Sequence, residues 1–340
     1  MESDSPLPLP PEDLSLAHAL QLDGRAPFRR IAEVLGVSDQ TVARRYTRLV
    51  ASGTLRAIGQ VDPLACGETS WMVRVRCTPD AAAALAEALA RREETSWVSL
   101  ISGGTEISLS VRELPQAAAS PDNLLLRRLP RTPRVTDVQA HARLHAYFGQ
   151  EQAPITRTGP LTAEQVAALA PEDGPDGSVL GRTLDERERV LVGVLARDGR
   201  APVAELAEAT GWSETTVRRR MSELRRTGAL YFDLDLDLEL INRGMRAALW
   251  LDVPPAGLAA AGRALAAHPE VGFAAATTGE HNLWATVSCR DGTALYRYLT
   301  ESVAAIPDLT RVITSPIHRT VKGPGPFPPA GRPQSTRPTR

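Results

Sequence analysis

Hydrophobic and polar positions follow the same order of helical and extended periods twice along this chain. Residues 23–55 are DGRAPFRRIAEVLGVSDQTVARRYTRLVASGTL and residues 198–230 are DGRAPVAELAEATGWSETTVRRRMSELRRTGAL, so a shift of 175 aligns them without a gap. Roughly half of the aligned positions are identical, which chance or shared composition does not readily produce. The chain is therefore a tandem duplication.

Each copy predicts three helices with an apolar face of helical period. The second helix ends at Gly36 or Gly211, where glycine allows the left-handed backbone of a tight turn. Ser38 and Ser213 then stand at the N-cap position of the third helix. The first helix has its apolar residues at matching places in the two copies: Leu16, Ala19 and Leu20, and then Leu191, Val194 and Leu195.

The third helix of each copy carries an apolar stripe with a polar face opposite to it. Side chains that donate hydrogen bonds on an outward helix face suit the major groove of DNA and its phosphates. Arg45 and Arg220 lie beside the apolar stripe, so we expect each to pair with a carboxylate inside the fold. The predicted DNA-binding residues are Ser38, Gln40, Thr41, Arg44, Arg48, Ser213, Thr215, Thr216 and Arg219.

A solvated arginine face on an ordinary helical bundle is the alternative interpretation of this helix. The duplication weighs against it. The glycine turn, the serine cap and the outward arginine recur together at fixed offsets, which is typical of a docking module.

After Gly53 and Gly228 the hydrophobic period changes to two. The segments TLRAIGQVD and ALYFDLDLDLEL predict β-arms, and the acidic second arm should face solvent or another subunit rather than DNA. The segments that follow in each copy predict a ferredoxin-like βαββαβ domain. Its strands are expected at 71–77, 95–102, 106–111 and 135–144, and again at 247–253, 271–278, 283–287 and 310–318, with helices at 80–92, about 121–129, 256–268 and 291–305.

The fold class is therefore α+β, with two β-armed or winged helix-turn-helix domains alternating with two ferredoxin-like domains. A βαββαβ sheet leaves one face uncovered by its own helices, so we expect the two sheets to pair within one chain, as a pseudo-dimer, or with a second chain, as a homodimer. The expected domains are a disordered N-terminus 1–11, helix-turn-helix 12–63, ferredoxin-like 67–148, linker 149–183, helix-turn-helix 184–243, ferredoxin-like 245–321 and a disordered tail 322–340.

This combination resembles the Lrp/AsnC family of feast-famine regulators. The matching pieces are the Ser-x-x-Thr-Val-x-Arg-Arg run at 38–45 and 213–220, the SGTLRAIGQVDPLACGE arm and the TTGEHNL turn. The resemblance covers about 12–148 and 184–321 as two fused copies. It implies transcription control through double-stranded DNA, in response to an amino acid or related small molecule bound by the ferredoxin-like (RAM) domains.

The resemblance places the effector at the glycine-containing turn between the second and third strands of each ferredoxin-like domain. Many members are similar to Gly-x-x-Asp there, whereas this chain has Glu106 in one copy and Asn282 in the other. Two hairpin loops that only keep the strand register are the alternative. The expected effector-binding residues are Gly103, Thr105, Glu106, Gly279, His281 and Asn282.

Composition and charge narrow the function further. The net charge is −1, so affinity for nucleic acid must come from local patches. The three cysteines show no paired spacing, so no disulfide framework is expected. No targeting segment and no run of 18 apolar residues is present, and the expectation is a cytoplasmic protein without a membrane, cofactor or metal.

Two other functions stay open. Siroheme decarboxylases resemble the same duplicated architecture and have an aromatic-Asn-Leu run that is similar to HNLW at 281–284. An enzyme of that kind needs histidines and arginines that converge on substrate carboxylates. The histidines show no repeated or metal-like spacing: His18, His141, His145, His268, His281 and His318. The third possibility is an interaction module whose helix-turn-helix units only dimerise.

Overall fold

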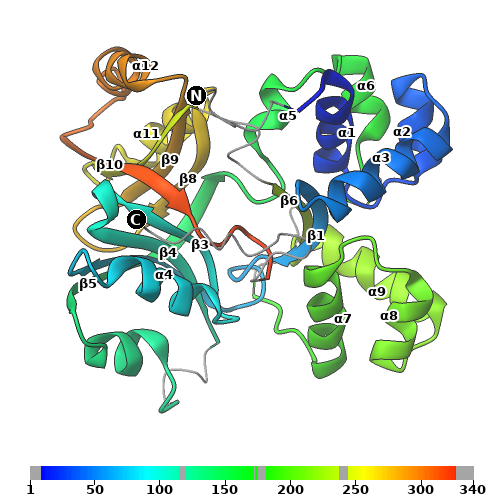
Figure 1. The fold of residues 1–340 in the computed structure, drawn as a ribbon, viewed down its shortest axis with the longest axis horizontal. Helices are drawn as coiled ribbons and strands as arrows, with labels where there is room; N and C mark the ends of the chain where they lie inside the picture. Colours follow the sequence, from blue (N-terminus) through cyan, green and yellow to red (C-terminus); the bar gives the residue numbers. More distant parts are fainter. Residues whose placement is uncertain (1–8, 115–119, 172, 175–180, 237–243, 327–340) are drawn as a thin grey trace, which may run out of the picture.

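The structure is a computed structural model that describes residues 9–114, 120–171, 173–174, 181–236 and 244–326. The expectations of a disordered N-terminus and tail fall for the most part on residues 1–8 and 327–340, which lie outside this range. The described residues combine helices and sheets as the α+β class requires. Two helix-turn-helix units lie on one side of the molecule and a closed β-barrel on the other (Figure 1).

Each helix-turn-helix unit has three helices, as the duplicated pattern predicts. Gly36 and Gly211 end the second helices with φ of 66° and 67°. Ser38 and Ser213 cap the third helices by accepting hydrogen bonds from the backbone of Thr41 and Thr216. The helices are α1 (Pro11–Leu22), α2 (Phe28–Leu35) and α3 (Asp39–Ala51), and then α7 (Glu186–Arg197), α8 (Val203–Thr210) and α9 (Glu214–Arg226).

The two β-arms pair with each other. Strand β1 (Leu55–Val61) lies antiparallel to β6 (Leu230–Leu236), so the acidic arm faces the other copy within the same chain. Arg56 and Asp235 stand opposite each other and form an ion pair of 3.2 Å. Asp233 lies opposite Ile58 and is buried, where its carboxylate accepts from Gln21 Nε2 at 3.0 Å. Burial raises the pKa of Asp233 to about 6.

The repeated DGRAP turns bind the two units together. Arg25 donates to the carbonyl groups of Gly199 and Ala201 at 2.7 and 3.1 Å, and Arg200 donates to those of Gly24 and Ala26 at 2.7 and 3.0 Å. The two contacts are related by the shift of 175, so they form a reciprocal clasp. A Cβ atom on Gly199 would lie 2.8 Å from the backbone of Ile58, and this close approach requires glycine.

Each ferredoxin-like domain has the strand order fourth, first, third, second. The first copy contains β2 (Thr69–Cys77), α4 (Ala82–Ala90), β3 (Thr95–Ile101), β4 (Glu106–Glu113), the short helices η3 (Leu124–Arg128) and η4 (Leu129–Arg131), and β5 (Val135–Phe148). The second contains β7 (Met245–Asp252), α11 (Leu258–Ala266), β8 (Val271–Thr277), β9 (Leu283–Cys289), α12 (Gly292–Arg297), η5 (Tyr298–Val303) and β10 (Arg311–Thr320).

The two sheets close into one eight-stranded barrel of order β10-β3-β4-β2-β5-β8-β9-β7. Strand β5 pairs with β8 and β10 pairs with β3, so the last strand of each copy joins the second strand of the other. Alternation along each strand then sends one set of side chains to the covering helices and the other into the barrel. Val73 and Val75 face α4, whereas Met72 faces Ala248 and Trp250 from the opposite sheet.

The segment expected as a linker contains two short helices that pack on the first helix-turn-helix unit. These are α5 (Pro154–Thr158) and α6 (Ala163–Leu169), and Ile155 and Leu169 join the core of that unit. Gln165 donates from Nε2 to the Val34 carbonyl at 2.9 Å, next to the glycine turn. Arg157 of α5 also donates to the His268 carbonyl of the second ferredoxin-like domain at 3.3 Å. The brace packs on the core of the first helix-turn-helix unit, and this makes the two copies structurally different (Figure 1).

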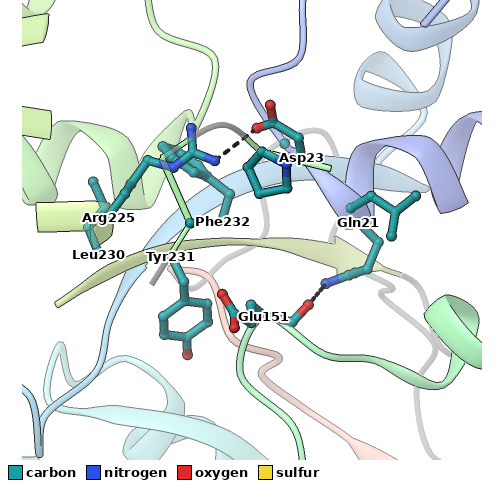
Figure 2. A pocket seen from close by; sticks show the side chains of 11 residues that line it. Gln21, Asp23, Glu151, Arg225, Leu230, Tyr231 and Phe232 are labelled. Atoms are coloured by element: carbon teal, nitrogen blue, oxygen red, sulfur yellow. Dashed lines mark hydrogen bonds and ion pairs between the residues drawn. The ribbon is translucent and has the colours of Figure 1, made fainter. Parts of the chain in front are cut away.

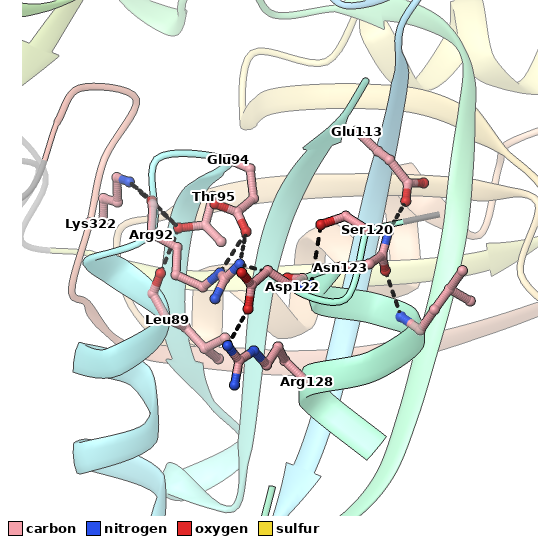
Figure 3. Close-up of polar contacts among 11 residues, drawn as sticks. Leu89, Arg92, Glu94, Thr95, Glu113, Ser120, Asp122, Asn123, Arg128 and Lys322 are labelled. Carbon is pink, nitrogen blue, oxygen red and sulfur yellow. Dashed lines mark hydrogen bonds and ion pairs between the residues drawn. The ribbon is translucent and has the colours of Figure 1, made fainter. Parts of the chain in front are cut away.

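The chain after β10 continues along the first copy instead of leaving the surface at residue 322. Val321 donates to the Val98 carbonyl, and Lys322 Nζ donates to the Arg92 carbonyl at 2.7 Å, just beyond the end of α4 (Figure 3). Burial lowers the pKa of Lys322 to about 8. No helix within the described ranges is long and apolar enough to span a bilayer.

The clasp gives a first prediction. Arg25→Ala and Arg200→Ala each leave buried carbonyl groups without a donor, so we expect each to lower the free energy of unfolding by about 1–3 kcal/mol. Chemical unfolding measures this. Arg29→Ala is the control, because the Arg29–Glu33 pair is exposed and should contribute less than about 0.5 kcal/mol. A clasp variant that is as stable as the control would contradict the role of the turn.

The buried carboxyl group of Asp233 gives a second prediction. Because its pKa is raised, the folded state binds the proton more tightly than the unfolded state, and this contribution to stability falls as pH rises from about 4 to about 6. Asp233→Asn removes the cost of ionisation, so the variant should exceed the parent in stability by about 1–3 kcal/mol at pH 8 and by little at pH 4. Unfolding at the two pH values tests this. Asp235→Asn, which breaks the Arg56 pair, should show no such gain.

Candidate nucleic-acid interface and effector site

The predicted DNA-binding residues lie on the outer faces of α3 and α9 or at their caps. Ser38 and Ser213 are engaged in capping, and their hydroxyl groups lie 2.8 and 2.9 Å from those of Thr41 and Thr216. Beyond the caps the exposed positions are Gln40, Arg44, Arg48, Thr215 and Arg219. Each helix therefore presents its first two turns to solvent, with polar side chains outward.

The arginines of the two helices differ in their ion pairs. On α9, Arg218 pairs with Glu214 at 3.1 Å, and Arg219 lies 3.9 Å from Glu223. On α3, Arg48 is tied to Asp13 of α1 at 2.6 Å. Arg44 has no carboxylate partner among the described residues and is exposed. The face of α3 thus keeps a free positive charge at its centre, whereas the α9 face is partly neutralised by its own glutamates.

The expectation that Arg45 and Arg220 both pair with a carboxylate is half right. Arg220 donates to Glu223 at 3.0 Å, within its own helix. Within the described part of the chain no carboxylate pairs with Arg45, so the prediction is wrong for that residue. Arg45 lacks the partner that Arg220 has, because the position equivalent to Glu223 in the first copy is occupied by Arg48.

A pocket lies where α9 meets the first helix-turn-helix unit and the segment that follows the first barrel half (Figure 2). Arg225 of α9 reaches across it to Asp23 at 3.3 Å and to Asp173 at 3.0 Å. Gln21 Nε2 lies 3.4 Å from the Glu151 carbonyl oxygen, and burial raises the pKa of the Glu151 carboxyl group. Arg225 therefore positions α9 against the other copy and is not part of its outer face.

The first glycine turn uses its acidic residue inside the barrel. Glu106 accepts from Arg74 at 2.7 Å, from Arg76 at 2.9 Å and from Ser102 at 2.9 Å, and it is 6% exposed. Burial raises the pKa of Glu106, but these hydrogen bonds outweigh burial and together hold this pKa below its ordinary value. Gly103 and Thr105 are exposed. Three residues of this turn were expected to contact an effector. One of them, Glu106, already forms ion pairs with Arg74 and Arg76.

The second turn is organised in the same way with different side chains. His281 Nδ1 lies 2.5 Å from the Asp252 carboxylate, and the ring is buried. Asn282 accepts from the Val253 N–H at 3.0 Å and donates to the Val253 carbonyl at 2.7 Å. Gly279 remains exposed. The side chains expected to bind an effector at this turn therefore hold the hairpin to strand β7.

Sequence reasoning missed Arg74, the central cation of the barrel interior. Its signal was present, because Arg74 alternates with Val73 and Val75 in β2 and so belongs to the face away from α4. A polar sheet face is ordinarily solvated, whereas here a second sheet covers it. Among the described residues no group of three or more histidine, cysteine, aspartate or glutamate side chains is arranged to hold a metal ion.

Family models match both kinds of domain in this chain. The model of the AsnC-type helix-turn-helix domain matches residues 13–50 and 184–225, and that of the Lrp/AsnC ligand binding domain matches residues 246–327. An uncharacterised HTH-type transcriptional regulator of Pyrococcus abyssi is 30% identical over 138 residues, which are 39% of this chain and 84% of that protein. The chain belongs to the Lrp/AsnC family of transcriptional regulators.

A second relative also matches a length of about one copy. The HTH-type transcriptional regulator FL11 of Pyrococcus horikoshii is 26% identical over 140 residues, which are 41% of this chain and 92% of that regulator. Each relative therefore corresponds to about one copy. The ligand-domain model matches only the second copy, and the first copy has the same strand order in the structure.

A whole-chain likeness exists to an enzyme. The crystal structure of the siroheme decarboxylase NirDL covers 92% of this chain and 92% of its own, with a TM-score of 0.61 and 16% identity. Its complex with an iron-uroporphyrin III analogue gives a TM-score of 0.60 with 15% identity. At this identity the likeness shows that the duplicated fold is shared.

The ion pair of Glu106 gives a third prediction. Glu106→Gln leaves the buried Arg74 guanidinium without its counter-charge, so we expect a loss of about 3–5 kcal/mol in the free energy of unfolding at pH 7. Because the pKa of Glu106 is depressed, its contribution is present above the unfolded pKa and is lost as pH falls through the folded pKa. The variant should therefore approach the parent in acid. Glu280→Gln in the exposed second turn is the control, and equal losses in the two variants would contradict the assignment.

Proposed function

We propose that this regulator binds specific double-stranded DNA as a fused pseudo-dimer, with α3 and α9 placed in successive major grooves, and that a small molecule bound by the ferredoxin-like half controls it. One observation carries the proposal. Two capped helices with polar outer faces are held in a fixed relation by the reciprocal arginine clasp and the β1–β6 ribbon. Two major-groove helices in one protein suit half-sites about one helical turn apart, roughly 34 Å.

The two half-sites are related and not identical under this proposal. Gln40, Thr41 and Arg44 face outward in the first copy, against Thr215, Thr216 and Arg219 in the second. Glutamine suits adenine and a free arginine suits guanine in the major groove, whereas threonine accepts either. The first copy therefore supplies the stronger base contacts, and Thr41, Thr216, Arg44 and Arg219 form the shared part of the interface.

The decarboxylase fold supports a second candidate function, an enzyme acting on siroheme. A substrate with several carboxylates needs cations that are free to receive them. Two arginines of the barrel strands already have carboxylate partners: Arg74 pairs with Glu106, and Arg143 pairs with Asp62. This charge balance, together with the regulator relatives, favours the regulator.

A mobility-shift assay on the promoter region of its own gene, with salt titrated, separates the functions. Specific binding whose logarithm falls steeply with the logarithm of salt concentration supports the regulator. Absence of binding, with release of carbon dioxide from added siroheme, would support the enzyme. Absence of both would leave the interaction module.

The unequal ion pairs of α3 and α9 give the fourth prediction. Arg44→Ala should weaken specific binding at least about tenfold and lower the salt dependence by about one counterion, because it removes a free charge at the interface. Arg219→Ala should cost less, since Glu223 already lies 3.9 Å away. Glu223→Gln should raise affinity several-fold by releasing Arg219 and Arg220.

The control for the last variant is Glu301→Gln, which changes the net charge equally at an exposed position on η5 of the barrel. It should leave DNA affinity unchanged. Unchanged affinity in both Arg44→Ala and Arg219→Ala would remove α3 and α9 from the interface.

A further inference from the structure

The DGRAP turn of each copy contacts the DNA-binding helix of the other copy, in addition to closing the clasp. The turn of the second copy carries Arg200, whose guanidinium carbon lies 5.5 Å from the centre of the Tyr46 ring on α3. The turn of the first copy carries Asp23, whose carboxylate lies 3.3 Å from Arg225 of α9 (Figure 2). Each DNA-binding helix is therefore in contact with a residue that belongs to the other copy.

The contact with α3 is a cation that lies over two aromatic rings. The Arg200 guanidinium carbon is 4.1 Å from the centre of the Phe28 ring, and the ring centres of Phe28 and Tyr46 are 5.5 Å apart. Burial lowers the pKa of Arg200, so its guanidinium is shielded from water, where attraction between a cation and a ring face is stronger. Because hydrogen bonds to Gly24 and Ala26 fix the guanidinium, it holds Tyr46 and α3 in one place.

Tyr46 has two anchors, and they come from different copies. Its hydroxyl oxygen accepts from the Ala57 N–H of β1 in the same copy at 3.3 Å, which is long for such a hydrogen bond. Arg200 of the other copy lies over its ring, and this contact continues through the clasp into the second helix-turn-helix unit. Substitutions that keep the ring or remove it therefore separate the two anchors.

The second copy has no equivalent of the two stacked rings. Val203 and Met221 occupy the corresponding positions, and α9 contains no aromatic residue. Arg25 instead lies over Phe232 of β6, 6.0 Å from the centre of its ring. The turn of the first copy therefore contacts α9 by other chemistry.

The contact with α9 is an ion pair shielded from solvent. The side chains of Arg225 and Asp23 are 13% and 9% exposed, and Arg225 also pairs with Asp173 at 3.0 Å. Asp23 Oδ1 accepts from the Arg25 N–H at 3.1 Å, so the carboxylate is fixed within its own turn. The position equivalent to Arg225 in the first copy is Val50, so this ion pair has no counterpart on α3.

We propose that the DGRAP turn of each copy positions the DNA-binding helix of the other copy, with Arg200 acting on α3 through Tyr46 and Asp23 acting on α9 through Arg225. Recognition of bases needs side chains held to within about 0.5 Å by supporting residues that are themselves fixed. The inference rests on the proposed function, in that α3 and α9 bind DNA. It makes recognition at one half-site depend on a residue of the other copy.

The test measures half-site discrimination, which is the affinity for the selected DNA site divided by the affinity for that site with one base pair changed. Arg44→Ala and Arg219→Ala first identify the half-sites of α3 and α9. Arg200→Lys keeps the charge and loses the planar group, so it should lower discrimination at the α3 half-site at least about threefold and leave the α9 half-site unchanged. Arg25→Lys makes the same change in the other turn and is the matched control, which should leave the α3 half-site unchanged.

Two variants of Tyr46 separate its anchors. Tyr46→Phe keeps the ring beneath Arg200 and loses the hydrogen bond from Ala57, so it should retain discrimination at the α3 half-site. Tyr46→Met introduces the residue type of the second copy and removes both anchors, so discrimination should fall as far as in Arg200→Lys. Equal losses in the two Tyr46 variants would assign the effect to the anchor within the same copy and overturn the role of Arg200.

The contact with α9 is tested by Asp23→Asn. This variant keeps the oxygen that accepts from the Arg25 N–H and removes the charge that faces Arg225, so discrimination should fall at the α9 half-site alone. Asp198→Asn is the matched control, because Asp198 accepts from the Arg200 N–H at 2.8 Å in the equivalent turn. It changes the net charge equally and should leave the α9 half-site unchanged. Circular dichroism establishes that every variant is folded.

Hydrogen exchange of the full chain without DNA distinguishes this inference from the proposed function. Amides of α3 should exchange faster in Arg200→Lys than in Arg25→Lys, and amides of α9 faster in Asp23→Asn than in Asp198→Asn. Equal exchange within each pair overturns the inference, and so does discrimination lost at the half-site of the same copy. A parent chain that selects no DNA contradicts the proposed function, and the exchange rates then decide whether the turns position the helices.

Discussion

Edge pairing between the two ferredoxin-like sheets holds the rest of this molecule in place. β5 pairs with β8 and β10 pairs with β3, so neither copy keeps an open strand edge at those positions. Closure also buries the sheet face that carries Arg74 and Trp250, which a single copy would expose to water. The same pairing brings the β-arms and the DGRAP turns together on the other side, where Arg25 and Arg200 complete the contact.

Because the two copies are fused in one chain, their sequences need not be identical. Copies within one chain can change separately, whereas identical subunits cannot. The results are visible at equivalent positions: Arg48 in the first copy corresponds to Glu223 in the second, and Ile58 corresponds to Asp233. The brace formed by α5 and α6 adds a further difference, because Ile155 and Leu169 join the core of the first helix-turn-helix unit. Unequal DNA contacts of the two copies are consistent with this division.

Local features of the fold were predictable from the sequence, because they depend on a few neighbouring residues. The glycine turns, the serine caps and the strand alternation are of this kind. The roles of Arg25, Glu106 and His281 were not predictable, because each depends on the surface that the other copy or the neighbouring strand presents. Sheet alternation placed Arg74 on the face opposite Val73, but only closure of the barrel determines that this face is buried. The helix α5 is five residues long and has no periodic signal.

The central claim is that one chain presents two different DNA-binding helices to one DNA face. Selection of binding sites from random double-stranded DNA, followed by measurement of how many chains bind each selected site, tests it most directly. The account predicts one chain per site, with two related and non-identical half-sites about one helical turn apart. Strictly symmetric sites that require two chains would contradict it.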